Sequence, residues 1–76
     1  MNNLNSLQIN TVYRVTSHKW IDKNVEYILI NGIEYEEDNE MPSRVEYTEF
    51  NSKHQFAGYG MSNSYQYLTE VLEAIK

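Results

Sequence analysis

The sequence predicts an α+β fold, a small four-stranded antiparallel sheet with one C-terminal helix packed on one face. Three observations predict it. Segments rich in Val, Ile, Thr and Tyr recur between residues 9 and 60, separated by short turn-forming stretches. The last segment instead repeats apolar residues at helical spacing. The length of 76 residues suits one domain, so we expect a frayed N-terminal segment over 1–8 and a single α+β domain over 9–76.

The first two strands are predicted over residues 9–20 and 25–30, where β-branched and aromatic residues are frequent. Asp, Lys and Asn at 22–24 are typical of a turn between them. The pair Asn31-Gly32 follows the second strand and matches a two-residue type I′ hairpin turn, in which both turn residues have positive φ. We therefore expect the chain to reverse at this pair.

This turn would set the register of the hairpin and the faces of its two arms, because side chains alternate across a strand. One face would be apolar and could form core, namely Ile28, Ile30, Ile33 and Tyr35. The other face would mix apolar residues with carboxylates, namely Val25, Tyr27, Leu29, Glu34 and Glu36.

The second half of the predicted sheet begins after a loop. Residues 36–43 must contain that loop, because Pro42 cannot donate a hydrogen bond within a central strand. A third strand is expected over 44–50, a turn over 51–54, and a fourth strand over 55–60.

The C-terminal segment is predicted to be a helix. Asn63, with Gln66 three residues later, resembles a capping box, and Ser62 and Ser64 are rival caps. The apolar residues repeat at positions i, i+3, i+4 and i+7 and would face the sheet, namely Leu68, Val71, Leu72 and Ile75.

The charge is negative and unevenly distributed. The net charge is −5, and eight of the eleven acids lie between residues 26 and 49, where Arg44 is the only base. Such a segment disfavours direct binding of nucleic acid, which needs a basic surface. The chain has no cysteine and no long apolar run, so we expect no disulfide, no membrane contact and a cytoplasmic protein.

No residue pattern indicates catalysis, a metal or a cofactor. His18 and His54 lack the spacing of metal-binding histidines, and the acids of residues 34–38 lack the pattern of a calcium-binding loop. No serine lies in a nucleophile elbow, and the glycines near residue 60 lack the lysine of a phosphate-binding loop. We therefore expect no catalytic residue, no metal site, no cofactor and no enzyme activity.

Aromatic residues are unusually frequent, with seven Tyr, two Phe and one Trp. We expect Tyr35, Phe56 and Tyr67 in the core. The other tyrosines cannot all be buried in so small a core, and exposed Tyr is a common anchor in protein interfaces.

These features favour a small acidic protein-binding module. It would inhibit a partner protein, such as a nucleic-acid-binding effector, by docking on its basic surface as a nucleic-acid mimic. In size and charge the chain resembles phage anti-defence proteins, such as anti-CRISPR and anti-restriction proteins. The residues predicted to bind the partner are Tyr27, Leu29, Glu34, Glu36, Glu37, Asp38, Glu40, Glu46, Tyr47 and Glu49.

The alternative is a homo-oligomeric structural or regulatory domain without catalysis. A small sheet with a spare aromatic face can bury that face against a second copy across a two-fold axis. Repulsion between acids near the axis counts against this alternative, although a homodimer stays open.

Overall fold

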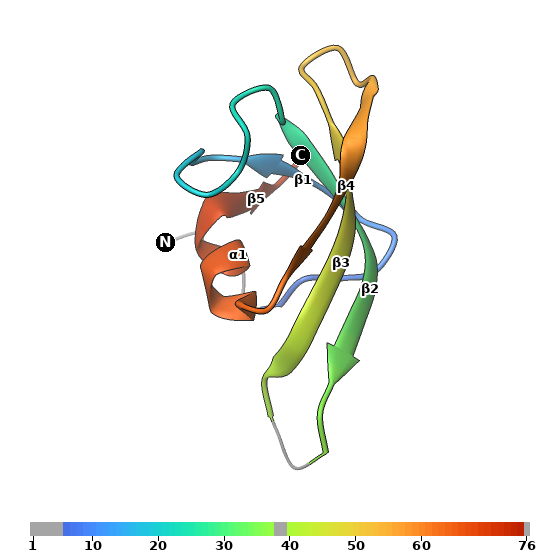
Figure 1. Cartoon of the computed structure of the whole chain (residues 1–76), viewed down its shortest axis with the longest axis vertical. Coiled ribbons are helices and arrows are strands. Elements are labelled where there is room, and N and C mark those ends of the chain that lie inside the picture. Colours follow the sequence, from blue (N-terminus) through green and yellow to red (C-terminus); the bar gives the residue numbers. More distant parts are fainter. Residues whose placement is uncertain (1–5, 38–39, 76) are drawn as a thin grey trace.

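The computed structural model describes residues 6–37 and 40–75. It is an α+β fold with a five-stranded antiparallel sheet and one short C-terminal helix (Figure 1). In chain order the elements are β1 (Val12–Val15), β2 (Tyr27–Tyr35), β3 (Pro42–Phe50), β4 (Phe56–Ser62), α1 (Tyr65–Val71) and β5 (Leu72–Ala74). The strand order is β4-β3-β2-β1-β5, so the predicted sheet lacked β5.

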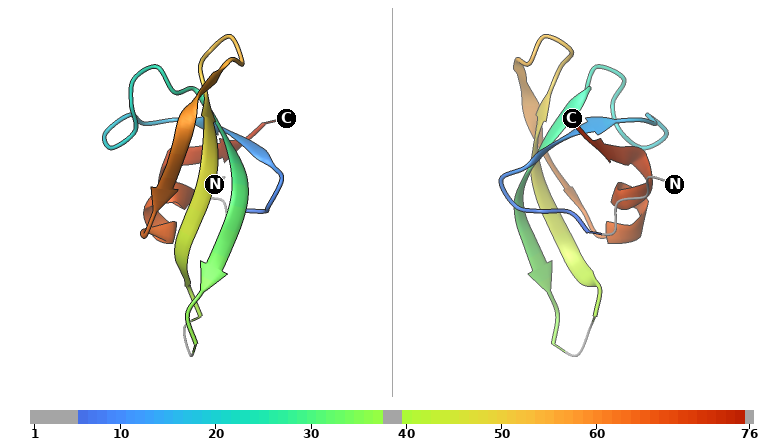
Figure 2. Two further views of the ribbon diagram at one scale, coloured as in Figure 1. Left: turned by 45° about the vertical axis from the view of Figure 1, so that its right-hand side comes forward. Right: turned by 180° about the vertical axis from the view of Figure 1, so that it is seen from behind.

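The sheet bends, and the helix lies inside the bend. Strands β2, β3 and β4 lie side by side along the long axis, while β1 and β5 cross near one end of them (Figure 2). The chain passes from β4 through α1 into β5, so the helix connects the two edge strands of the sheet. No helix among the described residues is both long and apolar enough to span a bilayer.

Strand β1 is shorter than the predicted segment of residues 9–20. Asn10 has a positive φ of 65°, which ends the regular strand, although its N–H still donates to the carbonyl of Ile30 at 2.7 Å. After Val15 the chain leaves the sheet and returns through the predicted turn, where the N–H of Val25 donates to the carbonyl of Asp22 at 3.0 Å.

The predicted hairpin turn at Asn31-Gly32 is wrong. Strand β2 continues through both residues, and neither has a positive φ. A β-bulge lies there instead, because Ile30 pairs with Tyr47 while Gly32 pairs with Glu46. The Asn31 side-chain amide donates to the Thr48 hydroxyl at 2.6 Å. Eight paired positions along β3 outweigh the local preference of Asn-Gly for a turn.

Most of the predicted faces survive this correction, because a bulge also inserts one extra residue between Ile30 and Ile33. Ile28 and Ile30 are fully buried, and Ile33 packs against the core. Tyr27 and Leu29 lie on the opposite face with Glu34. The register shifts again between Glu34 and Tyr35, and Tyr35 is 61% exposed, so its predicted place in the core is wrong.

The connections on either side of β3 follow the prediction. Pro42 is the first residue of β3, after the loop that joins it to β2. The 51–54 turn is held by the Asn51 carboxamide, whose oxygen accepts from the N–H groups of Lys53 and Gln55, both at 2.9 Å. His54 adopts a positive φ of 64° in this turn.

The helix is capped by Ser64, one of the two predicted rivals of Asn63, and it ends earlier than predicted. Ser64 is the N-cap, and its hydroxyl accepts from the N–H of Tyr67 at 3.3 Å. The helix ends at Val71 because Leu72 pairs with Val15 in the sheet. Ile75 is 51% exposed, so its predicted place on the buried stripe is wrong.

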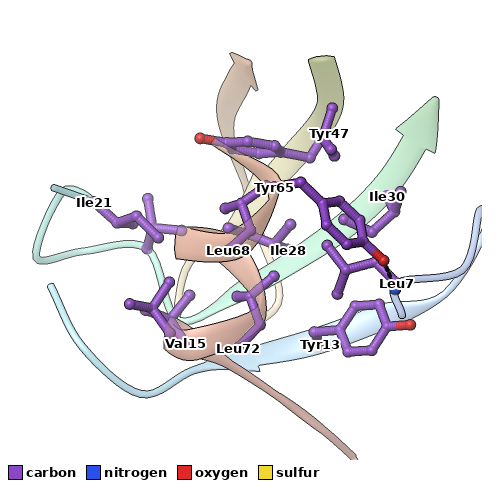
Figure 3. Packing of buried hydrophobic residues seen from close by; sticks show 13 residues of the cluster. Leu7, Tyr13, Val15, Ile21, Ile28, Ile30, Tyr47, Tyr65, Leu68 and Leu72 are labelled. Carbon is purple, nitrogen blue, oxygen red and sulfur yellow. Dashed lines mark hydrogen bonds between the residues drawn. The ribbon is translucent and has the colours of Figure 1, made fainter. Parts of the chain in front are cut away.

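The core lies between the bent sheet and α1 (Figure 3). Tyr65 and Leu68 of α1 point toward Ile28 and Ile30 of β2 (Figure 3). The N–H of Leu7, which is itself buried, donates to the Tyr65 hydroxyl at 2.7 Å. The buried residues are Leu7, Tyr13, Val15, Ile21, Val25, Ile28, Ile30, Val45, Tyr47, Tyr65, Leu68, Val71 and Leu72. Phe56, predicted to be core, is 59% exposed, whereas Tyr67 packs at the edge of the core.

Candidate protein-binding surface

The face of the sheet that points away from the core carries most of the predicted site, and we call it the outer face. Partners in the strand register point to the same side of an antiparallel sheet. The register therefore defines the outer face as Val12, Arg14, Tyr27, Leu29, Glu34, Arg44, Glu46, Thr48, Phe50, Phe56, Tyr59 and Met61.

Aromatic side chains form one end of the outer face. Tyr27 stacks on His54, with ring centroids 4.5 Å apart and an interplanar angle of 21°. Phe56 meets Tyr59 edge to face at 5.1 Å. Phe50 lies between these groups, because it is the register partner of both Tyr27 and Phe56. These contacts hold large rings in place at the surface, so little side-chain entropy would be lost when a partner covers them.

Arg44, Glu34 and Glu46 form a charged group at the other end. The Arg44 guanidinium lies 2.7 Å from Glu34 and 3.4 Å from Glu46. The hydrogen bond to Glu34 and the charges of both carboxylates raise the pKa of Arg44. Both carboxylates remain about half exposed, so each can still accept hydrogen bonds from outside the chain.

The acid segment continues beyond the outer face into the loop between β2 and β3. Glu36, Glu37 and Glu40 are exposed, and none forms an ion pair within the described part of the chain. Asp38, also predicted to bind the partner, lies outside the described residues. This end of the hairpin therefore carries negative charge that Arg44 does not balance.

A shallow hollow of about 430 Å³ joins the two ends of the outer face. It is lined by Asn31, Glu46, Tyr47, Tyr59, Gly60 and Met61. Tyr59 is 77% exposed and Met61 is 52% exposed. The hollow thus places one carboxylate beside an open aromatic ring and a thioether, which suits a long basic side chain with an apolar stem.

Two of the predicted residues lie on the inner side of the sheet. Tyr47 is buried, with its ring over Gly60 of β4. Glu49 is half-buried, and burial followed by the negative charge of Asp22 raises the pKa of its carboxyl group. The candidate surface therefore comprises Tyr27, Leu29, Glu34 and Glu46 on the outer face together with the loop acids, without Tyr47 and Glu49.

The prediction also missed residues of the surface, mainly on β4. Phe56 and Tyr59 belong to the outer face, although they are three residues apart and a regular alternation would place them on opposite faces. The register shifts between Phe56 and Gly58, which brings them to the same face. In the sequence, Gly58 was the residue that could have indicated this bulge. In the structure it has a positive φ of 145°.

A second hollow lies between the 16–26 loop and α1, with a volume of about 390 Å³. Trp20, Met61 and Tyr67 line it together with the hydroxyls of Ser62 and Ser64. Its described lining contains no carboxylate and no imidazole. His18, which could act as a base, is instead 2.8 Å from the carbonyl of Val25. Within the described residues, no three His, Cys, Asp or Glu side chains are grouped as metal ligands would be.

No protein family model matches the chain, and neither a curated protein nor a solved structure matches it significantly.

Proposed function

We propose that the protein is a non-catalytic binding module that docks on a basic surface of a partner protein and thereby inhibits it. The observation that carries the proposal is the composition of the outer face, where exposed aromatic residues adjoin carboxylates on the three long paired strands β2, β3 and β4. Interfaces of this kind gain affinity from a few desolvated anchors and gain specificity and association rate from charge.

Each part of the surface has a separate role in this proposal. The exposed carboxylates of Glu36, Glu37 and Glu40 would attract the partner over several ångströms. High salt would screen this attraction. Tyr27 and Leu29 would act after contact, because they are half-buried apolar side chains that a partner can cover fully.

The hollow at Glu46 would receive a lysine or arginine of the partner. The Glu46 carboxylate lies 3.4 Å from Arg44, longer than the 2.7 Å contact that Arg44 makes with Glu34. A partner cation could therefore replace Arg44 at Glu46 while the Arg44–Glu34 pair stays intact. The exposed ring of Tyr59 would add a cation–π contact.

Basic protein surfaces commonly bind nucleic acid, so a carboxylate-rich module that covers one would act as a competitor. The partner would be a cytoplasmic nucleic-acid-binding protein, as is the case for phage anti-defence inhibitors, which the chain resembles in size and charge.

The test is capture followed by competition. The immobilised protein is exposed to extract of the source host at low and high salt, and retained proteins are identified by mass spectrometry. We expect a basic nucleic-acid-binding protein that is lost at high salt and is displaced by added nucleic acid. Retention that salt and nucleic acid leave unchanged would contradict the proposal.

A further inference from the structure

The outer edge of β4 is unprotected. β4 is the first strand in the sheet order, and no described residue pairs with its free side. In the left view of Figure 2, β4 is the outermost of the three long strands. Residues 55–64 contain no charged residue and no proline, although exposed edge strands usually carry one or the other to prevent pairing with a second chain.

The two faces of β4 differ sharply in size. Tyr59 and Met61 project from the outer face and are 77% and 52% exposed. The alternate positions are Gly58, Gly60 and Ser62. The large side chains of β4 itself therefore project only from the outer face, whereas on the inner face the Tyr47 ring of β3 lies over Gly60.

We propose that β4 pairs with β4 of a second copy of the chain, antiparallel across a two-fold axis centred on Gly60. This register uses the whole strand beyond its bulge, from residue 58 to residue 62. It places Tyr59 opposite Met61 of the second copy and Met61 opposite Tyr59 of the second copy. Sulfur–aromatic contacts and the backbone hydrogen bonds of alternate residues would join the two strands.

The charge pattern favours a second copy over a basic partner at this edge. Residues 55–64 carry no charge, and an antiparallel edge is complementary to itself under two-fold symmetry. The nearest acids of the strip, Glu46 and Glu49, belong to β3. The two β3 strands would stand three strand spacings apart, about 14 Å, which exceeds the screening length of about 8 Å at physiological salt.

The small surface area that this pairing would bury predicts a weak dimer. Two tyrosines, two methionines and the facing backbone would bury several hundred square ångströms, which is less than the roughly 1,000 Å² of a stable complex. We therefore expect dimerisation that depends on protein concentration. The pairing shares Tyr59 and Met61 with the hollow of the proposed function, but it does not use the loop acids Glu36, Glu37 and Glu40. Variants of the loop acids and variants of β4 therefore test the two proposals separately.

The test is sedimentation velocity of the full chain over a wide range of concentrations, with matched variants. Tyr59→Lys places a charge between the two paired β4 strands. Tyr35→Lys is the control, because it makes the same change at the end of β2, where the side chain is 61% exposed. We expect wild type and Tyr35→Lys to reach twice the monomer mass, and Tyr59→Lys to dimerise at least tenfold more weakly.

A charge-exchange experiment tests the register and does not depend on one variant. Tyr59→Lys/Met61→Lys and Tyr59→Glu/Met61→Glu should each be monomeric and should form a dimer when mixed. Amide exchange of wild-type β4 should slow as concentration rises, which is informative even if a variant unfolds. A wild type that stays monomeric, or a dimer that Tyr59→Lys leaves intact, would overturn the proposal.

Discussion

Gly60 lies directly under the aromatic ring of Tyr47, which leaves no room for a side chain. A Cβ at this position would fall within the ring of Tyr47, closer than any van der Waals contact. Gly32 differs, because a Cβ there would meet only the Glu46 carboxylate at 3.7 Å, and its φ is not positive. The packing of Tyr47 therefore requires a glycine at position 60, whereas position 32 has room for a side chain.

Gly60→Ala should destabilise the fold by about 1–3 kcal/mol, because the Tyr47 ring must leave its preferred position. Gly32→Ala, the control, should be neutral or slightly stabilising, since alanine restricts the unfolded chain more than glycine does. Urea unfolding of both variants measures the difference. Equal midpoints for the two would contradict the position assigned to Tyr47.

Glu49 predicts a pH dependence. Burial raises its folded pKa, followed in size by the charge of Asp22. Protonated Glu49 therefore favours the folded state below the unfolded pKa, and this contribution is lost as pH rises through the raised folded value. Glu49→Gln should melt a few degrees higher than wild type at neutral pH, and the gap should close on acidification.

Thermal melts between pH 4 and 8 test this, with about half-unit steps to cover the range in which glutamates titrate. Glu70→Gln, at an exposed position of α1, is the control for removing one negative charge. A gap between Glu49→Gln and wild type that does not change with pH would contradict the environment assigned to Glu49.

At the scale of elements, the C-terminal segment shows how one apolar pattern can serve two structures. Leu68 and Val71 face the core from α1, and Leu72 faces it from β5. The helical repeat correctly predicted these three as buried but could not show the change to strand. That change depends on β1, because Thr16 donates to the carbonyl of Val71 at 2.7 Å and Val15 pairs with Leu72.

Leu68→Ala should cost about 2–5 kcal/mol, through lost burial and the cavity left behind. Ile75→Ala is the control, because a helix continued through residue 75 would bury Ile75 as well. We expect Ile75→Ala to change stability by less than about 0.5 kcal/mol. A similar loss in both variants, measured by thermal unfolding, would show that the helix extends beyond Val71.

The remaining elements were predictable where the signal was local. The turns at 22–24 and 51–54 and the strand at 44–50 depend on nearby residues, and the structure confirms them. The Asn31-Gly32 turn failed because pairing with β3 decides that position. Tyr35 and Phe56 were wrongly predicted to be buried, because a register shift lies beside each of them. Such a shift interrupts the alternation of side chains between the two faces of the sheet.

At the scale of the molecule, the acid segment and the core are separate. The core has no buried polar or charged residue among the described positions. Within the described residues, the loop acids Glu36 and Glu37 form no ion pair. The sequence indicated part of the candidate surface, namely the acids and the half-buried Tyr27 and Leu29. Phe56 and Tyr59 of β4 could be assigned to the surface only from the pairing register of β3 and β4.

Glu36→Gln/Glu37→Gln should leave the midpoint of unfolding unchanged or raise it slightly, because exposed charges contribute about 0–1 kcal/mol and these two repel each other. Chemical unfolding at low salt is the measurement. A clear loss of stability would mean that the acids serve the fold and not a partner.

Binding kinetics with the captured partner test the central claim most directly. Glu36→Gln/Glu37→Gln should slow association, and added salt should remove the difference from wild type. The control Asp22→Asn/Glu70→Gln removes the same charge elsewhere and should bind as wild type does; Tyr27→Ala should instead speed dissociation. Equal association rates for wild type and the loop variant at low salt would contradict the proposal that this acid segment recognises a basic partner.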